Sequence, residues 1–207
     1  ERIKFTRQHA EKLFQRHLNK KISWYESIEE GLNNLLAFVD CENDSQRYVL
    51  KVCGDSWERI KTEGEVSAMT FVRERTTLPT PQVIAYSSDK KNEFGREWIV
   101  MTRTEGKSLR TSFNHEDDIW PKLSLEERKS IIDQLVGYVK QLHTRIPSSS
   151  LIGSYTRDGQ VIHDNCHKGP WKNYREYFYD QLDEKIKTLK GEKVFEPVRD
   201  DVLAAIK

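Results

Sequence analysis

A lysine lies within an apolar stretch of the sequence. Lys51 stands in residues 48–53, Tyr-Val-Leu-Lys-Val-Cys, a composition typical of a β-strand. Because side chains alternate along a strand, Lys51 shares a face with Val49 and Cys53. An ammonium group removed from water is costly unless an opposite charge pairs with it. The sequence therefore predicts an acidic partner for Lys51.

The favoured partner is Glu65, in the helical segment 57–75. Helical spacing places its carboxylate on the helix face that should pack against the sheet. The apolar members of that face are Ala68, Met69 and Val72. A strand lysine paired with a helix glutamate is how protein-kinase folds hold the α- and β-phosphates of ATP. Glu63 is the alternative partner, and an exposed lysine with a solvated Glu65 is the alternative to any pairing.

Two further segments could contact a nucleotide. Gly31, Asn33 and Asn34 precede the apolar run 35–39, and glycine there would let the backbone approach a phosphate closely. Residues 98–106 read as a strand that ends in a polar segment with a glycine, which is typical of a hinge with exposed backbone groups. A plain turn and a plain strand end are the simpler interpretations of these two segments.

The segment 163–167, His-Asp-Asn-Cys-His, contains metal-ligand residue types. Its spacing fits no standard zinc pattern, and it differs from a kinase catalytic loop, where His precedes Asp by two residues. We interpret it as a polar surface loop, and we assign no metal ligand and no catalytic residue in the chain.

Hydrophobic periodicity then supplies the elements that would position these residues. The first hundred residues alternate strands with helices, and the second half is mostly helical. The expected helices cover 5–18, 57–75, a segment opened by a capping box of Ser124 and Glu127, and 171–190, and the expected strands cover 35–39, 48–53, 83–86 and 98–101.

The composition limits the partners of the chain. Its 207 residues carry 34 basic and 33 acidic side chains in interleaved order, which disfavours nucleic acid. No apolar run approaches the roughly 20 residues of a membrane span. Cys41, Cys53 and Cys166 form no CxxC pair, which favours a reducing, cytoplasmic setting. The oligomeric state stays open.

Read in order, the motifs resemble the aminoglycoside phosphotransferase and choline-kinase-like family from about residue 30 to residue 155. The segments that carry the resemblance are 31–36 (Gly-Leu-Asn-Asn-Leu-Leu), 48–52, 63–72, 78–86, 94–106, 134–143 and 152–155. The resemblance implies an α+β, protein-kinase-like two-lobe fold. Residues 1–104 would form an N-lobe with an antiparallel sheet, and residues 105–207 would form the helical first part of a C-lobe.

The same resemblance implies transfer of a phosphoryl group from ATP or GTP, with Mg²⁺, to a hydroxyl of a small molecule. Lys51 would contact the α- and β-phosphates, and Glu65 would orient it. The residues implied to surround the rest of the nucleotide are Gly31, Asn33 and Asn34 over the phosphates, Met101 behind the adenine, and the Thr102 carbonyl and Thr104 amide at its edge.

One departure from the family is serious. The sequence contains no His-Gly-Asp-x-x-x-x-Asn loop, which supplies the base and a metal ligand in the family, and no later metal-binding Asp. The apolar helical pattern that begins at Val198 is interrupted at Lys207, which suggests a truncated C-lobe. We therefore expect little kinase activity from this chain alone. A fragment of an active small-molecule kinase, a nucleotide-binding pseudokinase that acts as an interaction module, and a scaffold without nucleotide all remain possible, and the acceptor stays open.

Overall fold

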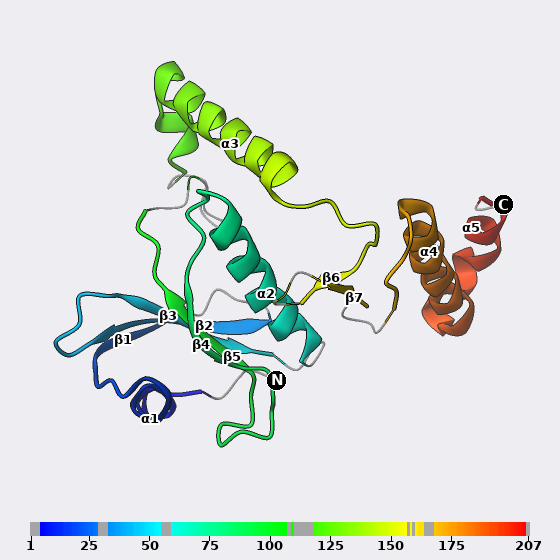
Figure 1. Ribbon diagram of the computed structural model, residues 1–207. Helices are drawn as coiled ribbons and strands as arrows, with labels where there is room; N and C mark the ends of the chain where they lie inside the picture. Colours follow the sequence, from blue (N-terminus) through cyan, green and yellow to red (C-terminus); the bar gives the residue numbers. More distant parts are fainter. Residues whose placement is uncertain are drawn as a thin grey trace. The chain divides into compact units, whose positions relative to one another are not determined.

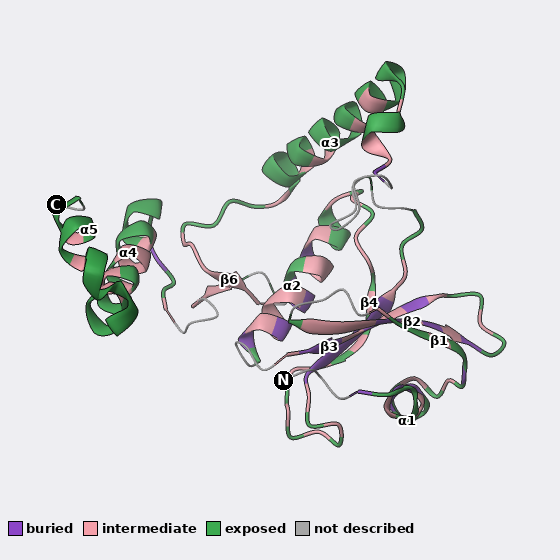
Figure 2. Cartoon of the chain, turned by 180° about the vertical axis from the view of Figure 1, so that it is seen from behind, coloured by how far each residue is buried: buried purple, intermediate pink, exposed green. Residues whose placement is uncertain are grey.

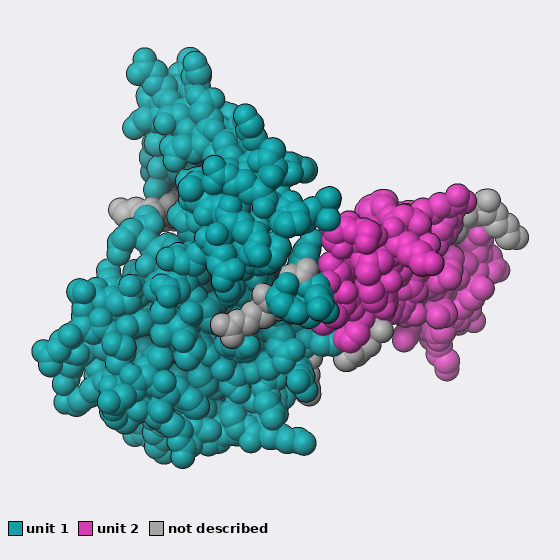
Figure 3. Space-filling model, in the orientation of Figure 1, with its two compact units in different colours: residues 1–148, 155–160 teal, residues 149–154, 161–207 magenta. Residues whose placement is uncertain are grey.

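The computed structural model describes residues 5–28, 33–54, 59–106, 109, 118–156, 158, 160–163 and 168–205. The chain divides into two compact units, coloured separately in Figure 3. Unit 1 comprises residues 1–148 and 155–160, and unit 2 comprises residues 149–154 and 161–207. The lobe boundary expected at residue 104 stays a prediction.

Unit 1 is built on a five-stranded sheet in which every neighbouring pair is antiparallel (Figure 1). The strand order is β1-β2-β3-β5-β4. The strands are β1 (Ile22–Ile28), β2 (Asn34–Cys41), β3 (Tyr48–Cys53), β4 (Val83–Ser87) and β5 (Trp98–Thr102). An antiparallel sheet combined with helices is the α+β class that the sequence predicted.

Two helices cover opposite faces of this sheet, α1 (Arg7–Leu18) and α2 (Ile60–Arg75) (Figure 1). Strand alternation sends every second side chain to each helix. The α1 side holds the larger core, whose fully buried members include Leu13, Phe14, Val39, Leu50, Val52, Trp98 and Val100. The α2 side holds a smaller core of Val66, Ile99 and Met101, with Val49, Met69 and Val83 partly buried against it.

The expected elements of unit 1 are present, with corrections at their edges. The strand 48–53 has the bounds that we predicted, and the helix expected from residue 5 begins at Arg7. Ala68 is exposed, so its predicted place on the packed face of α2 is wrong. The packed face instead buries Thr62 and Val66, with Met69 partly buried beside Val66. Strand β1 was not predicted.

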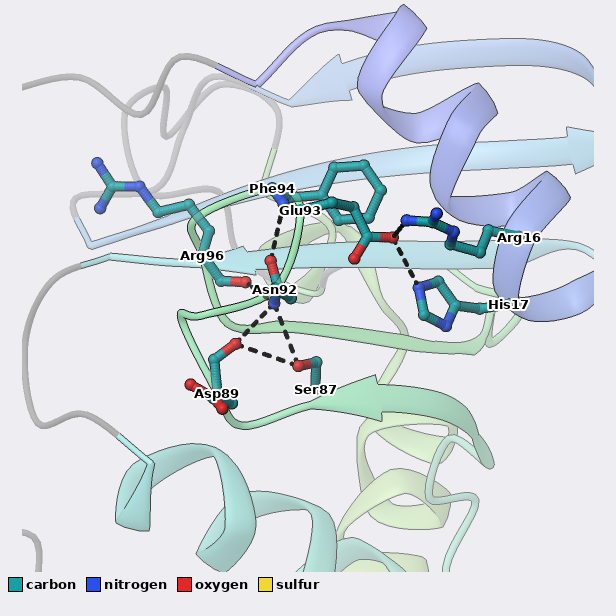
Figure 4. Close-up of polar contacts among 8 residues, drawn as sticks. All are labelled: Arg16, His17, Ser87, Asp89, Asn92, Glu93, Phe94 and Arg96. Carbon is teal, nitrogen blue, oxygen red and sulfur yellow. Dashed lines mark hydrogen bonds and ion pairs between the residues drawn. The ribbon is translucent and has the colours of Figure 1, made fainter.

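The connection between β4 and β5 is an ordered polar turn (Figure 4). The side-chain amide of Asn92 donates to Ser87 Oγ at 3.1 Å and to the carbonyls of Asp89 and Arg96, both at 2.7 Å. Glu93 then fastens the turn to α1, since its Oε1 lies 2.7 Å from Nη1 of Arg16. The turn thus holds β4 and β5 in register from the α1 side.

Helix α3 (Leu125–Arg145) opens with the predicted capping box. Ser124 N–H donates to Glu127 Oε2 at 2.8 Å, and Glu127 N–H donates to Ser124 Oγ at 3.2 Å. At the other end of the helix, Gln141 Oε1 accepts from the Thr77 amide at 2.7 Å, in the connection between α2 and β4. Helix α3 buries none of its residues (Figure 2). The exposed apolar side chains along it are Leu125, Ile132, Leu135, Val136, Val139 and Leu142.

The remaining described elements are two-residue strands, 3₁₀ helices and the α-helices α4 and α5. They are η2 (Trp120–Lys122), β6 (Ser154–Tyr155), β7 (Val161–Ile162), α4 (Tyr174–Gly191), η3 (Lys193–Val198) and α5 (Arg199–Ala205). In unit 2, Trp171 is buried and its Nε1–H donates to Asp180 Oδ2 at 3.1 Å. Across the described ranges, no helix is both long enough and apolar enough to cross a membrane.

Candidate functional site

Lys51 and Glu65 form an ion pair between the sheet and α2. In the sheet register, Lys51 lies opposite Leu36 of β2 and Ile99 of β5. Its Nζ donates a hydrogen bond to Glu65 Oε2. The exposed fraction is 12% for the Lys51 side chain and 30% for that of Glu65. The predicted pairing is therefore present, in a partly buried setting where charge–charge attraction is stronger than on the surface.

The alternative partner, Glu63, points elsewhere. Its Oε1 lies 3.0 Å from Nε of Arg59 and accepts a hydrogen bond from Ser88 Oγ at 2.9 Å. The interpretation of Lys51 as an exposed lysine is also wrong, because its side chain lies between the sheet and α2.

Lys51 keeps hydrogen-bonding capacity for a ligand. An ammonium group has three N–H donors, and within the described ranges Glu65 is its one hydrogen-bond acceptor. Two donors therefore remain on a cation whose position is fixed by its partner. A fixed cation with free donors suits the oxygens of a phosphate, which accept strong charge-assisted hydrogen bonds.

A buried glutamate attaches the start of α2 to the sheet. Glu97 is 3% exposed, and its Oε1 accepts a hydrogen bond from the Arg59 amide at 2.6 Å. Its own carbonyl accepts from the Cys53 amide at 2.8 Å. Glu97 thus connects the strand that carries Lys51 to the helix that carries Glu65. Sequence reasoning missed it, because its partner is a backbone amide 38 residues away.

The end of β3 brings together the residues expected near the phosphates. Asn34 lies opposite Cys53 in the register, and Asn33 precedes it, whereas Gly31 lies outside the described residues. Gly54 follows β3, and a Cβ atom there would lie 2.2 Å from the Asn33 carbonyl oxygen. Only glycine allows this close approach of the two chain segments.

A second cation reaches this end of the sheet. Lys61 of α2 donates from Nζ to Asn34 Oδ1 at 3.3 Å. We did not single out Lys61 from the sequence, although it precedes Glu65 by four residues, and residues at that spacing share one side of a helix. The two lysines and Asn34 therefore lie on the α2 side of the sheet, where their donors could share one anionic ligand.

The residues expected at the nucleobase lie at the end of β5. Met101 is 8% exposed in the core beneath α2. The Thr102 amide donates to the Gln82 carbonyl at 2.9 Å, so that amide is already paired. Thr104 is exposed, and its amide makes no hydrogen bond to the residues that the structure describes. Of these three residues, Thr104 is the one with a free backbone donor.

The described residues contain no cluster of three or more side chains of the types that ligate metals. Of the segment 163–167, only His163 is described, so the interpretation of that segment as a polar surface loop stays a prediction.

An antiparallel sheet whose lysine pairs with a glutamate of the covering helix is the arrangement found in protein-kinase-like folds. Residues 24–190 match the phosphotransferase enzyme family (APH), and the chain belongs to that family. This membership confirms the resemblance seen in the sequence.

Solved structures show the same fold. The aminoglycoside phosphotransferase APH(4)-Ia superposes with a TM-score of 0.58 at 15% identity, over 86% of this chain and 51% of that structure. A thermostable mutant of it, in ternary complex with AMP-PNP and hygromycin B, gives 0.56 at 16% identity, over 84% of this chain and 49% of that one. The chain therefore spans about half the length of these structures.

A curated relative is similar over a shorter stretch. A subtelomeric hrmA-associated cluster protein of Aspergillus fumigatus is 39% identical over 74 residues, which is 36% of this chain and 13% of that protein. The chain thus covers a small part of that relative.

Proposed function

We propose that this chain is the nucleotide-binding part of a kinase that phosphorylates a hydroxyl of a small molecule. The observation that carries the proposal is the ion pair of Lys51 and Glu65 on the α2 side of the sheet. ATP or GTP is the phosphoryl donor. Complexes of APH(4)-Ia with AMP-PNP and with ADP support a nucleotide as ligand of this fold.

In this proposal Lys51 binds the α- and β-phosphates with its two free donors, and Glu65 holds the ammonium group in place. Asn33 and Asn34, with Gly31, lie over the phosphates. Phosphoryl transfer depends mainly on positioning and on stabilising the charge of the phosphates. In this proposal the chain binds and orients the nucleotide that donates the phosphoryl group.

The nucleobase of the bound nucleotide is proposed to lie at the end of β5. Met101 forms the wall behind it, and the Thr102 carbonyl and the Thr104 amide meet its edge. The free amide of Thr104 supports this assignment, since an exposed donor at a strand end can pair with a ring nitrogen of a purine. The assignment keeps both adenine and guanine as candidates.

The catalytic base and the metal ligands are proposed to belong to polypeptide outside these 207 residues. The sequence lacks the family loop that supplies them, and the chain covers only 51% of the APH(4)-Ia structure. The acceptor is proposed to be a hydroxylated small molecule, the class to which the hygromycin B bound by that relative belongs.

Calorimetric titration of the 207-residue chain with AMP-PNP tests the nucleotide site. We expect binding by the wild type, an affinity at least about tenfold weaker for Lys51→Ala because a charge-assisted contact is lost, and unchanged binding for Lys12→Ala on the exposed side of α1. Equal affinity of Lys51→Ala and wild type, or no binding by the wild type, would overturn the proposal.

The missing loop also supports a second candidate, a nucleotide-binding pseudokinase that acts as an interaction module. Transfer of labelled phosphate from ATP to a panel of hydroxylated small molecules, assayed with the complete gene product, separates the two. Transfer supports the kinase, whereas nucleotide binding without transfer to any acceptor supports the pseudokinase.

A further inference from the structure

An arginine stacks on an aromatic ring beside the proposed base site. Arg103 follows β5 directly, and its amide donates to the Arg47 carbonyl at 2.9 Å, which continues the pairing with the chain entering β3. Its guanidinium carbon lies 3.6 Å from the centroid of the Phe38 ring. At that distance the two groups are in van der Waals contact and nothing fits between them.

The Phe38 ring lies on the same sheet face as Lys51. Its neighbours Ala37 and Val39 are buried in the core under α1, so alternation turns Phe38 to the α2 side. In the sheet register Phe38 lies opposite Val49, and Val49 lies opposite Met101. The ring therefore lies on the same sheet face as Met101, two strands away across β3.

Burying the Arg103 side chain in this position costs free energy. Its Nη1 is buried and has no hydrogen-bond partner in the part of the chain that the structure describes. A buried donor without an acceptor loses its hydration without replacement. Stacking on the ring partly offsets this cost. In the position seen in the structure, Arg103 thus combines favourable stacking on Phe38 with an unpaired Nη1 donor. A ligand that took the place of Arg103 on the ring would return that donor to water.

We propose that the Phe38 ring is the stacking platform for the nucleobase and that Arg103 occupies this platform when no nucleotide is bound. A base stacked on that ring face needs the space that the guanidinium fills. Base binding therefore displaces Arg103, whose Nη1 then regains hydrogen bonds. This inference rests on the proposed function, because it assigns a role to residues beside the same nucleotide site.

The proposal makes Arg103 a competitor of the base and leaves the phosphates unaffected. Removing its side chain with Arg103→Ala should tighten AMP-PNP binding by about fivefold to tenfold, since the base no longer has to displace a stacked group. Phe38→Ala should weaken AMP-PNP binding by about tenfold or more, because stacking on an aromatic side chain is lost. Inorganic tripolyphosphate, which has no base, should bind the wild type and Arg103→Ala equally.

Arg47→Ala is the matched control. It removes the same charge near the same strand ends, but Arg47 pairs with Asp40, Nε to Oδ1 at 3.2 Å, and its side chain is 42% exposed. Tighter AMP-PNP binding by Arg103→Ala alone supports the proposal. Unchanged or weaker binding by Arg103→Ala, or equal tightening by Arg47→Ala, would overturn it.

A second measurement uses the wild-type chain and needs no substitution. The Phe38 ring current should shift the side-chain Nε–H resonance of Arg103 in the free protein, and AMP-PNP should return it to the position of a solvated arginine. A resonance that stays shifted at saturation contradicts the displacement. If AMP-PNP binds none of the proteins, the proposed function itself fails, and that result is distinct from the failure of Arg103 as a competitor.

Discussion

The side-chain carboxyl of Glu97 accepts a hydrogen bond from the backbone amide of Arg59 at 2.6 Å, and this contact attaches the start of α2 to the first residues of the β5 segment. The same residue receives the Cys53 amide on its carbonyl. Because β3 carries Lys51 and α2 carries Glu65, the relative placement of the ion pair depends on a residue that belongs to neither element.

Glu97→Ala should therefore destabilise unit 1. It leaves the Arg59 amide without its acceptor, a loss of about 1–3 kcal/mol for a buried donor. Urea unfolding monitored by tryptophan fluorescence measures this loss of stability, since Trp98 is the adjacent buried residue. Glu105→Ala, at an exposed site, is the control and should leave the urea midpoint of unfolding unchanged. A midpoint for Glu97→Ala equal to that of the wild type would show that the contact is dispensable.

Glu65→Gln should weaken nucleotide binding without unfolding the chain. The amide keeps the size of the side chain but removes the negative charge that fixes the Lys51 ammonium group. We expect AMP-PNP affinity to fall about threefold to tenfold, less than for Lys51→Ala, because the cation remains. Glu63→Gln is the matched control two residues away, as Glu63 contacts Arg59 and Ser88 instead. A similar loss in both variants would point to α2 as a whole rather than to the pair.

Periodicity was sufficient to predict most of the elements, and together with the cost of an unpaired buried charge it favoured Glu65 over Glu63 as the partner of Lys51. The strand 48–53 and the place of Met69 on the packed face of α2 follow from the spacing of apolar residues. The capping box at Ser124 follows from two residue types three positions apart. Each of these signals is local in sequence, so no tertiary information is needed to find it.

The features that sequence reasoning missed depend on contacts between distant segments. β1 is an edge strand in which Ile22 is buried while Trp24 is 39% exposed, so its apolar residues do not alternate with period two. Glu97 has the residue type of a surface position, and only the start of α2 explains its burial. The stack of Arg103 on Phe38 requires β2 and the end of β5 to be brought together by β3.

The stability of unit 1 should fall in acid through Asp44. Hydrogen bonds from Lys20 Nζ and the Tyr48 hydroxyl, both at 2.6 Å, and from the Gln46 amide at 2.9 Å lower the pKa of Asp44 from 3.8 to about 2. A folded-state pKa below the ordinary value stabilises the fold above that ordinary value, and the contribution is lost as the pH falls through the folded-state pKa. The window therefore lies between about pH 4 and pH 2.

Asp44→Asn tests this contribution. At pH 7 the wild type should be more stable by about 1 kcal/mol, a value reduced by solvent around the pair, and the difference should shrink as the pH falls from 4 to 2. Urea unfolding at several pH values measures it. Glu42→Gln is the control, because its ion pair with Lys21, at 2.7 Å, joins side chains that are 44% and 74% exposed. A difference between Asp44→Asn and wild type that does not change with pH would exclude Asp44 as the titrating group.

The start of α3 should depend on Ser124. Ser124→Ala removes the oxygen that accepts the Glu127 amide, at a typical cost of about 1 kcal/mol for a helix N-cap. The hydrogen bond from the Ser124 amide to Glu127 Oε2, which contributes most to lowering the pKa of Glu127, should loosen as well. Amide hydrogen exchange should accelerate at Glu127 and within the first turn, and it should stay unchanged near Gln141, which is held by Thr77.

Ser130→Ala, in the interior of the same helix, changes a serine without touching the cap and should not accelerate exchange at Glu127. Equal exchange at Glu127 in Ser124→Ala and wild type would mean that water satisfies the amide as well as the serine does.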